Sequence, residues 1–147
     1  MKKLLYVLIA FTTLSACKKD EKTPEPTLQG NWELTSIVRQ PNAGEPTKDD
    51  YPDGDYREYL SFENDGNVYF LGTVKNISNW TNDDIYTSTN NKITFTHENY
   101  FGDNVTYSIN GSTLTITEIY SDITYVYTYK KSDFDVKKAY TEYNLPK

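Results

Sequence analysis

The sequence is poor in the residues from which disulfides, metal sites and nucleophilic active sites are usually built. Its 147 residues include one cysteine, one histidine and one methionine. A single cysteine cannot form a disulfide within the chain, so no disulfide contributes to the stability of the fold. Serine and threonine hydroxyls remain as ordinary nucleophiles, and no glycine-rich phosphate loop is present. We therefore expect a protein that is not an enzyme and that binds neither a cofactor nor a metal.

Positive charge and long apolar runs are also scarce. Against 21 acidic residues the chain carries 15 lysines and arginines, which gives a formal net charge of −6. A chain this acidic, without a basic stripe, is a poor partner for nucleic acid, so we expect none. The apolar run Leu4–Leu14 is too short to cross a bilayer. The length of the remaining chain fits one domain with one hydrophobic core.

The N-terminus has the pattern of a secretory signal. Lys2 and Lys3 precede the apolar run, and small residues follow it. The sequence of Leu14–Cys17 is LSAC, which resembles a bacterial lipobox, in which cleavage before the cysteine leaves that cysteine acylated. The alternative is an ordinary secretory signal beside an unrelated cysteine.

The lipobox resemblance implies that residues 1–16 are a lipoprotein signal peptide and that Cys17 is the lipidation site. Two or three acyl chains, such as palmitate, would hold the protein firmly on a membrane. Residues 17–27 would form the lipidated cysteine and a flexible tether, because they combine charges and two prolines without apolar periodicity. By analogy with bacterial sorting, Lys18 favours the outer membrane, on its periplasmic or cell-surface side.

Beyond the tether, alternating apolar and polar residues predict a series of β-strands. The first, residues 28–39, alternates from Trp32 onward, with Trp32, Leu34 and Val38 on one face. Seven more strands are expected at residues 56–63, 67–74, 85–89, 92–97, 104–109, 113–119 and 123–130. Asn-Asp-Gly, Asn-Asn and Asn-Gly turns join several of them as hairpins. Eight antiparallel strands suit a closed barrel that is filled by side chains or holds one small ligand.

The lengths of the connections suggest that the two ends of this barrel differ. Three short turns fall at the end that contains Trp32. The longer segments 40–55, 75–84 and 98–103 fall at the opposite end, where the turn at residues 121–122 is short. This distribution predicts a cup with one open end. The tail, residues 132–143, is expected to form a short helix that Ser132 caps, on the outside of the wall; a frayed tail is the alternative.

Three stretches resemble the lipocalin-like families, including their bacterial lipoproteins: LQGNW at residues 28–32, LSFENDGNVYF at 60–70 and YSINGSTLTIT at 107–117. The resemblance implies an eight-stranded antiparallel up-and-down barrel over residues 28–147, with a helix from about residue 132. It also implies that Trp32 plugs one end, with Lys130 or Lys131 stacked on its ring in place of the usual arginine.

Three polar side chains share the inward phase near the open end, namely Glu58, His97 and Glu118. Two carboxylates beside an imidazole can bind a cation or exchange protons, whereas the alternative places all three in water at the rim. The chain is also rich in tyrosine, which suits ligand recognition as well as an exposed sheet face. We expect the ligand to contact Tyr56, Glu58, Phe70, His97, Tyr107, Glu118 and Tyr125.

Acidic residues crowd the segment 49–58, which contains Asp49, Asp50, Asp53, Asp55 and Glu58. This segment fits either a solvated lid or a weak calcium site. It is not an EF-hand, because Tyr51 and Leu60 would occupy positions that need oxygen ligands.

Two functions fit these patterns. The first is a monomeric, membrane-anchored lipocalin-like lipoprotein that binds a small or medium-sized ligand at the open end of its barrel. The alternative is a cell-surface protein-interaction or inhibitor module with a solidly packed barrel, which contacts its partner through residues 40–55 and 75–84.

Overall fold

The computed structural model describes residues 27–97 and 100–145 of the chain. The predicted signal peptide, the predicted lipidation site Cys17 and all but the last residue of the predicted tether lie outside the described residues. Within the described ranges, no helix has the length and apolar character needed to cross a membrane.

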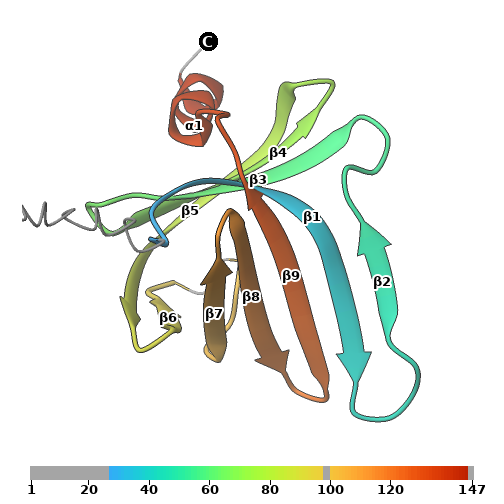
Figure 1. Cartoon of the computed structure of the whole chain (residues 1–147). Helices are drawn as coiled ribbons and strands as arrows, with labels where there is room; N and C mark the ends of the chain where they lie inside the picture. Colours follow the sequence, from blue (N-terminus) through green and yellow to red (C-terminus); the bar gives the residue numbers. More distant parts are fainter. Residues whose placement is uncertain (1–26, 98–99, 146–147) are drawn as a thin grey trace, which may run out of the picture.

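The described residues form nine strands and one helix (Figure 1). They are β1 (Gly30–Pro41), β2 (Thr47–Asp50), β3 (Tyr56–Phe62), β4 (Asn67–Val74), β5 (Ile77–Thr89), β6 (Lys92–Phe95), β7 (Val105–Asn110), β8 (Thr113–Tyr120), β9 (Ile123–Lys131) and α1 (Val136–Asn144). Strands β3 to β9 each pair with the next in antiparallel fashion, and β1 pairs with both β3 and β9. Eight strands thus close an up-and-down barrel, which confirms the predicted fold class.

Strand β1 is shared between three neighbours. One edge pairs with β9 along most of its length, while the other edge pairs first with β3 through residues 30–33 and then with β2 through residues 36–39. The segment 40–55, expected as an irregular connection, therefore contains the short edge strand β2. Its sequence, Thr-Lys-Asp-Asp, does not predict a strand, because charged residues are depleted in strands. On an exposed edge strand such residues protect against pairing with another chain.

Strand β5 is longer than the predicted strand at residues 85–89. A two-residue turn at Lys75 and Asn76, both with positive φ (52° and 62°), joins it directly to β4. The first half of β5 is rich in Asn and Asp, which are rare in strands, so the pattern predicted a loop there. The expectation of a long connection at residues 75–84 is therefore wrong. The open end of the barrel has two short turns, at residues 75–76 and 121–122, instead of one.

Trp32 closes one end of the barrel, here called the closed end. Its side chain is 1% exposed, and its indole Nε1 donates a hydrogen bond to the carbonyl oxygen of Leu28 at 2.8 Å. The Lys131 ammonium lies 4.3 Å from the centroid of the indole ring. Gly30 leaves room for it, since a Cβ at that position would lie 2.6 Å from Lys131 Nζ. Both the plug and the lysine on its ring are as predicted.

The core fills the barrel around this plug. Alternate residues of the strands are buried or packed against the core, namely Leu60, Phe62, Phe70, Ile93, Phe95, Val105, Tyr107, Ile109, Leu114, Ile116, Tyr125, Tyr127 and Tyr129. In β1 the phase differs from the prediction, because the register with β9 shifts between Leu34 and Ser36. After this bulge Ile37 joins the core in place of Val38.

Helix α1 packs on the outer face of β3 and β4, as expected (Figure 1). Val136 is buried against Tyr59 and Leu71, and the Phe134 ring stacks on Tyr59 with centroids 4.5 Å apart. The predicted cap is wrong. Asp135 caps the helix by accepting from the backbone N–H of Lys138, whereas the Ser132 hydroxyl accepts from the N–H of Phe134.

Candidate functional site

The middle of the barrel is occupied by aromatic rings from the connection between β6 and β7. Phe101 is 1% exposed and packs against Phe95 and Tyr127, with centroids 5.4 and 5.1 Å away. Tyr100 stacks on Phe70 at 4.5 Å and on Trp80 at 5.8 Å. Phe70, one of the predicted ligand contacts, therefore lies in the packed core.

The Glu118 carboxylate holds this connection inside the barrel. The side chain is 7% exposed, and its Oε1 accepts from the backbone N–H of Gly102 at 2.7 Å. Its Oε2 accepts from the Tyr127 hydroxyl at 3.1 Å. Both carboxylate oxygens of Glu118 therefore already accept a hydrogen bond. Glu118 holds the segment that carries Tyr100 and Phe101 in place, and neither of its oxygens is left to bind a ligand.

The second buried carboxylate, Glu58, is only half satisfied. It is also 7% exposed, and its Oε2 accepts from the Tyr56 hydroxyl at 3.0 Å. Its Oε1 is buried without a hydrogen-bond partner among the described residues. Burial raises the pKa of Glu58 to about 7, against a smaller lowering by the Tyr56 hydrogen bond. Glu58 therefore titrates in a higher pH range than an exposed glutamate does.

Trp80 fixes the position of Tyr56 and so of Glu58. Its indole Nε1 donates to the Tyr56 hydroxyl oxygen at 2.9 Å. The ring can lie there because Gly72, its partner on β4, has no side chain; a Cβ at Gly72 would lie 1.9 Å from the indole nitrogen. The sequence predicted Trp80 on a contact loop, whereas the structure places it on β5, packed against the barrel core.

Phenol groups surround Glu58. Burial, followed by the negative charge of Glu58, raises the pKa of Tyr51 and of the fully buried Tyr129. Burial also raises the pKa of Tyr56, to about 12, and that of Tyr127, and Glu58 contributes to both. Tyr51, Tyr56 and Tyr127 are half-buried. These three tyrosines and Glu58 are called the mouth below.

Tyr125 lies next to the mouth, and its ring stacks on Tyr127 with centroids 6.2 Å apart. Tyr107 lies elsewhere. It neighbours Tyr86, whose hydroxyl donates to the carbonyl oxygen of Glu63 near the closed end. The predicted ligand contacts Tyr56, Glu58 and Tyr125 are thus in or beside the mouth, whereas Tyr107 is not.

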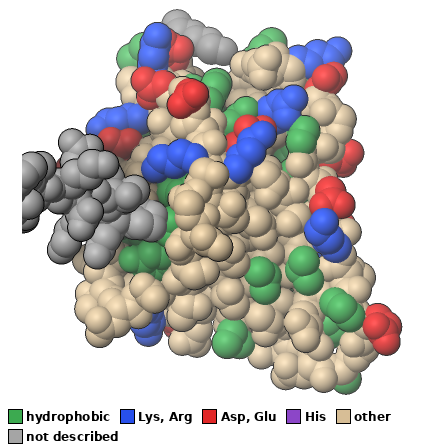
Figure 2. Space-filling model, in the orientation of Figure 1, with side chains coloured by type: hydrophobic (Ala, Val, Ile, Leu, Met, Phe, Trp, Pro, Cys, Tyr) green, Lys and Arg blue, Asp and Glu red, His purple; other side chains and the backbone are tan. Residues whose placement is uncertain are grey.

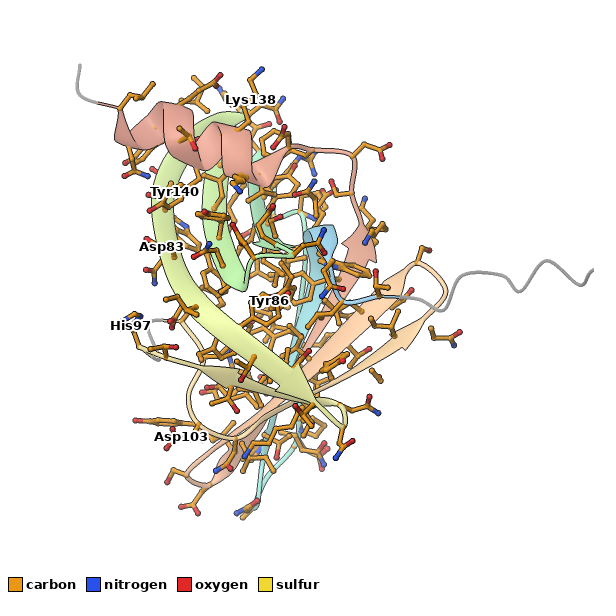
Figure 3. All side chains as sticks on the ribbon, turned by 90° about the vertical axis from the view of Figure 1, so that its left-hand side faces the viewer. Asp83, Tyr86, His97, Asp103, Lys138 and Tyr140 are labelled. Atoms are coloured by element: carbon orange, nitrogen blue, oxygen red, sulfur yellow. The ribbon has the colours of Figure 1, made fainter. Side chains whose placement is uncertain are left out.

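His97 does not join the two glutamates, so the predicted cluster of Glu58, His97 and Glu118 is wrong. The His97 ring is 57% exposed, and its Nδ1 lies 2.9 Å from Oδ1 of the buried Asp84. Figure 3 shows His97 at the margin of the molecule, whereas Tyr86 lies within the barrel. The phase argument failed because β6 ends at Phe95, two residues before the histidine.

The acidic segment is dispersed rather than gathered around one point. Asp49 pairs with Arg39, Asp50 with Lys48, and Asp55 with Lys75. Across residues 27–97 and 100–145, no three His, Cys, Asp or Glu side chains come together as metal ligands.

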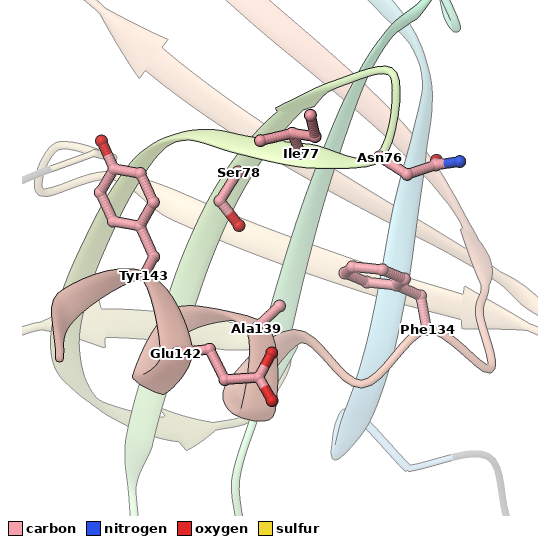
Figure 4. A pocket seen from close by; sticks show the side chains of 7 residues that line it. All are labelled: Asn76, Ile77, Ser78, Phe134, Ala139, Glu142 and Tyr143. Carbon is pink, nitrogen blue, oxygen red and sulfur yellow. The ribbon is translucent and has the colours of Figure 1, made fainter. Parts of the chain in front are cut away.

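A separate hollow lies outside the barrel, between α1 and the β4–β5 turn (Figure 4). Its volume is about 450 Å³, and it is lined by Asn76, Ile77, Ser78, Phe134, Ala139, Glu142 and Tyr143. Ile77 is 73% exposed at its edge. We call this hollow the α1 groove.

The surface has an uneven distribution of side chains. On the face shown in Figure 2, lysines and arginines gather in the upper half, while the lower half carries few charges. At the turn between β8 and β9, Ile119 and Tyr120 are 57% and 67% exposed. This turn lies at the end of the barrel opposite Trp32.

Comparison with known proteins adds no further information, because the chain matches no protein-family model and no curated protein.

Proposed function

We propose that the protein is a membrane-anchored, lipocalin-like lipoprotein that binds a small or medium-sized ligand at the open end of its barrel. The observation that carries this proposal is the buried Glu58 Oε1, which lacks a hydrogen-bond partner among the described residues beside three half-buried tyrosines. Leaving a buried polar atom unpaired costs about 1–3 kcal/mol, so a ligand that supplies the missing donor recovers that free energy.

The tyrosines supply the rest of the binding surface. Each offers a large, rigid ring and a hydroxyl, so it can bury apolar ligand surface and orient a polar group. The rings of Tyr100 and Phe101 fill the barrel below the mouth, so the proposed ligand lies near the opening of the barrel. We propose binding rather than catalysis, without a cofactor or a nucleic-acid partner.

The proposed anchor is compatible with access to the mouth. The LSAC sequence and the charged segment after it support lipidation at Cys17 and an outer-membrane location, facing the periplasm or the cell exterior. The described chain enters the barrel at the closed end, where the carbonyl group of Leu28 accepts from Trp32. A monomer attached at that end has its mouth at the opposite end from the attachment.

Binding of the neutral fluorescent probe N-phenyl-1-naphthylamine to the purified full-length protein tests the proposal. We expect fluorescence enhancement that is strongly reduced in Tyr51→Ala, which removes a mouth ring, and retained in Ile77→Ser, which alters the α1 groove. Loss of binding in Ile77→Ser with retention in Tyr51→Ala would place the site on the helix side and overturn the proposal.

The second candidate function is a protein-interaction module. It is favoured by the packed aromatic interior together with the exposed Ile119 and Tyr120. Contiguous exposed apolar side chains mark protein–protein contact surfaces when they form a large enough patch. If the probe fails to bind the wild-type protein, this function becomes the better account.

A further inference from the structure

We infer that the ligand of the mouth is a small organic cation, whose ammonium group donates a hydrogen bond to Glu58 Oε1 while its carbon skeleton contacts the tyrosine rings. The inference rests on the proposed function and names the chemical class of the ligand at that same site.

The contrast between the two buried glutamates indicates where a ligand group is missing. Both are 7% exposed, but Glu118 has a donor on each oxygen, from Gly102 and Tyr127. Within the part of the chain that the structure describes, Glu58 has a donor on one oxygen only. Among buried side-chain oxygens without partners in the described residues, those of Asn31 and Thr73 belong to neutral groups, whereas the oxygen of Glu58 belongs to a carboxylate. A charged donor is the strongest complement to a carboxylate.

The charges around the mouth favour a cation. Besides burial, Glu58, Asp49 and Asp53 raise the pKa of Tyr51, and Arg39 lowers it. Arg39 is itself paired with Asp49. The local field is therefore negative, which attracts a cationic ligand and repels an anionic one.

The rings of the mouth are suited to an ammonium group. The Tyr51 and Tyr56 rings are neighbours, with centroids 6.3 Å apart and an angle of 56° between their planes. A cation over the face of either ring gains from the ring quadrupole. The same attraction operates inside this protein, where the Lys131 ammonium lies 4.3 Å from the centroid of the Trp32 ring.

Binding of a cation is coupled to the proton on Glu58. Because the pKa of Glu58 is about 7, part of the free protein carries that proton at neutral pH. An ammonium group favours the carboxylate and lowers this pKa, so binding releases a proton and strengthens as pH rises. The titratable groups that face Glu58 are Tyr51, Tyr56, Tyr127 and Tyr129, with Glu118 beyond them. The pKa values of the four tyrosines are raised, so these phenols remain protonated throughout this range.

The experiment compares three probes of similar shape and different charge by isothermal titration of the full-length protein. They are phenethylammonium, 2-phenylethanol and 3-phenylpropanoate. We expect phenethylammonium to bind about tenfold or more tightly than the alcohol, and the carboxylate to bind most weakly. Titrations in two buffers of different ionisation enthalpy should show proton release on binding of the ammonium alone.

Matched variants assign the effect to the mouth. Glu58→Gln should remove both the preference for the ammonium and the proton release. Glu142→Gln removes one negative charge from the α1 groove and should change neither. The proton measurement needs only the wild-type protein, so the test stands even if Glu58→Gln folds poorly.

The outcomes separate this inference from the proposed function. Equal binding of ammonium and alcohol, or a preference that Glu58→Gln leaves intact, overturns the cationic ligand. Binding of N-phenyl-1-naphthylamine without binding of phenethylammonium also overturns it, while ligand binding at the mouth stands. If none of the four compounds binds, both are wrong.

Discussion

Replacement of Glu58 by glutamine is expected to stabilise the free protein at alkaline pH. Glu58 is a buried carboxylate with a hydrogen bond to only one of its oxygens among the described residues, so it is costly to ionise, and the neutral amide has the same shape without that cost. Burial raises the pKa of Glu58 from 4.5 to about 7. One unit of pKa shift corresponds to about 1.4 kcal/mol, so ionisation of Glu58 costs about 3 kcal/mol more in the folded than in the unfolded state.

The sign of the pH dependence follows from this pKa. Below 4.5 the carboxyl is protonated in both the folded and the unfolded state, and its contribution to stability is fully present. Between 4.5 and about 7 the unfolded state loses the proton first, so stability falls as pH rises. Above about 7 both states are ionised, and the loss is complete.

Urea denaturation of wild type and Glu58→Gln, followed by tryptophan fluorescence across this range, measures the effect. We expect the free energy of unfolding of Glu58→Gln, relative to that of wild type, to be about 3 kcal/mol higher at alkaline pH than at acidic pH. Tyr56→Phe, which removes the hydrogen bond that lowers the pKa of Glu58, should move the transition in wild-type background to higher pH. A difference in stability between wild type and Glu58→Gln that does not vary with pH would show that burial does not raise the pKa of Glu58.

Three further substitutions test other parts of the structure. Gly72→Ala forces a Cβ into the Trp80 indole and should destabilise the protein by about 1–3 kcal/mol in urea denaturation, with a smaller cost when Trp80→Leu is also present; an additive pair would contradict the contact. Trp32→Ala should cost about 3–5 kcal/mol, and a cost below about 1 kcal/mol would deny its role as the plug of the closed end. Cys17→Ala should release the protein from membranes without unfolding it, as fractionation and circular dichroism would show; firm membrane attachment after carbonate washing would contradict the anchor.

Most of the barrel could be predicted because its strands alternate clearly and its turns use Gly and Asn at positive φ. Trp32, Phe62 and Leu114 follow the simple rule that every second residue faces the core. The pattern failed where polar residues form strands, in β2 and in the first half of β5. These segments form strands because β2 pairs with β1 and β5 pairs with β4. Such pairing joins distant parts of the chain, so the local sequence pattern does not reveal it.

The mouth was harder to predict than the barrel. Tyr56 and Glu58 followed from the phase of β3, but the half-satisfied state of Glu58 depends on Trp80, which reaches Tyr56 from β5 across Gly72. The Trp-Gly pairing is non-local, although a glycine within a strand is a signal that another group approaches closely. His97 was misplaced because extrapolating the inward phase beyond the end of β6 has no physical basis.

Ligand binding at the mouth above a packed interior can be followed through the two indole N–H signals in a ¹⁵N NMR spectrum. Trp80 donates its indole hydrogen to Tyr56 in the mouth, whereas Trp32 donates to Leu28 at the closed end. On titration with N-phenyl-1-naphthylamine the Trp80 indole signal should shift progressively and the Trp32 signal should stay in place. A shift of the Trp32 signal alone, or binding of the probe with both indole signals unmoved, would contradict binding at the mouth.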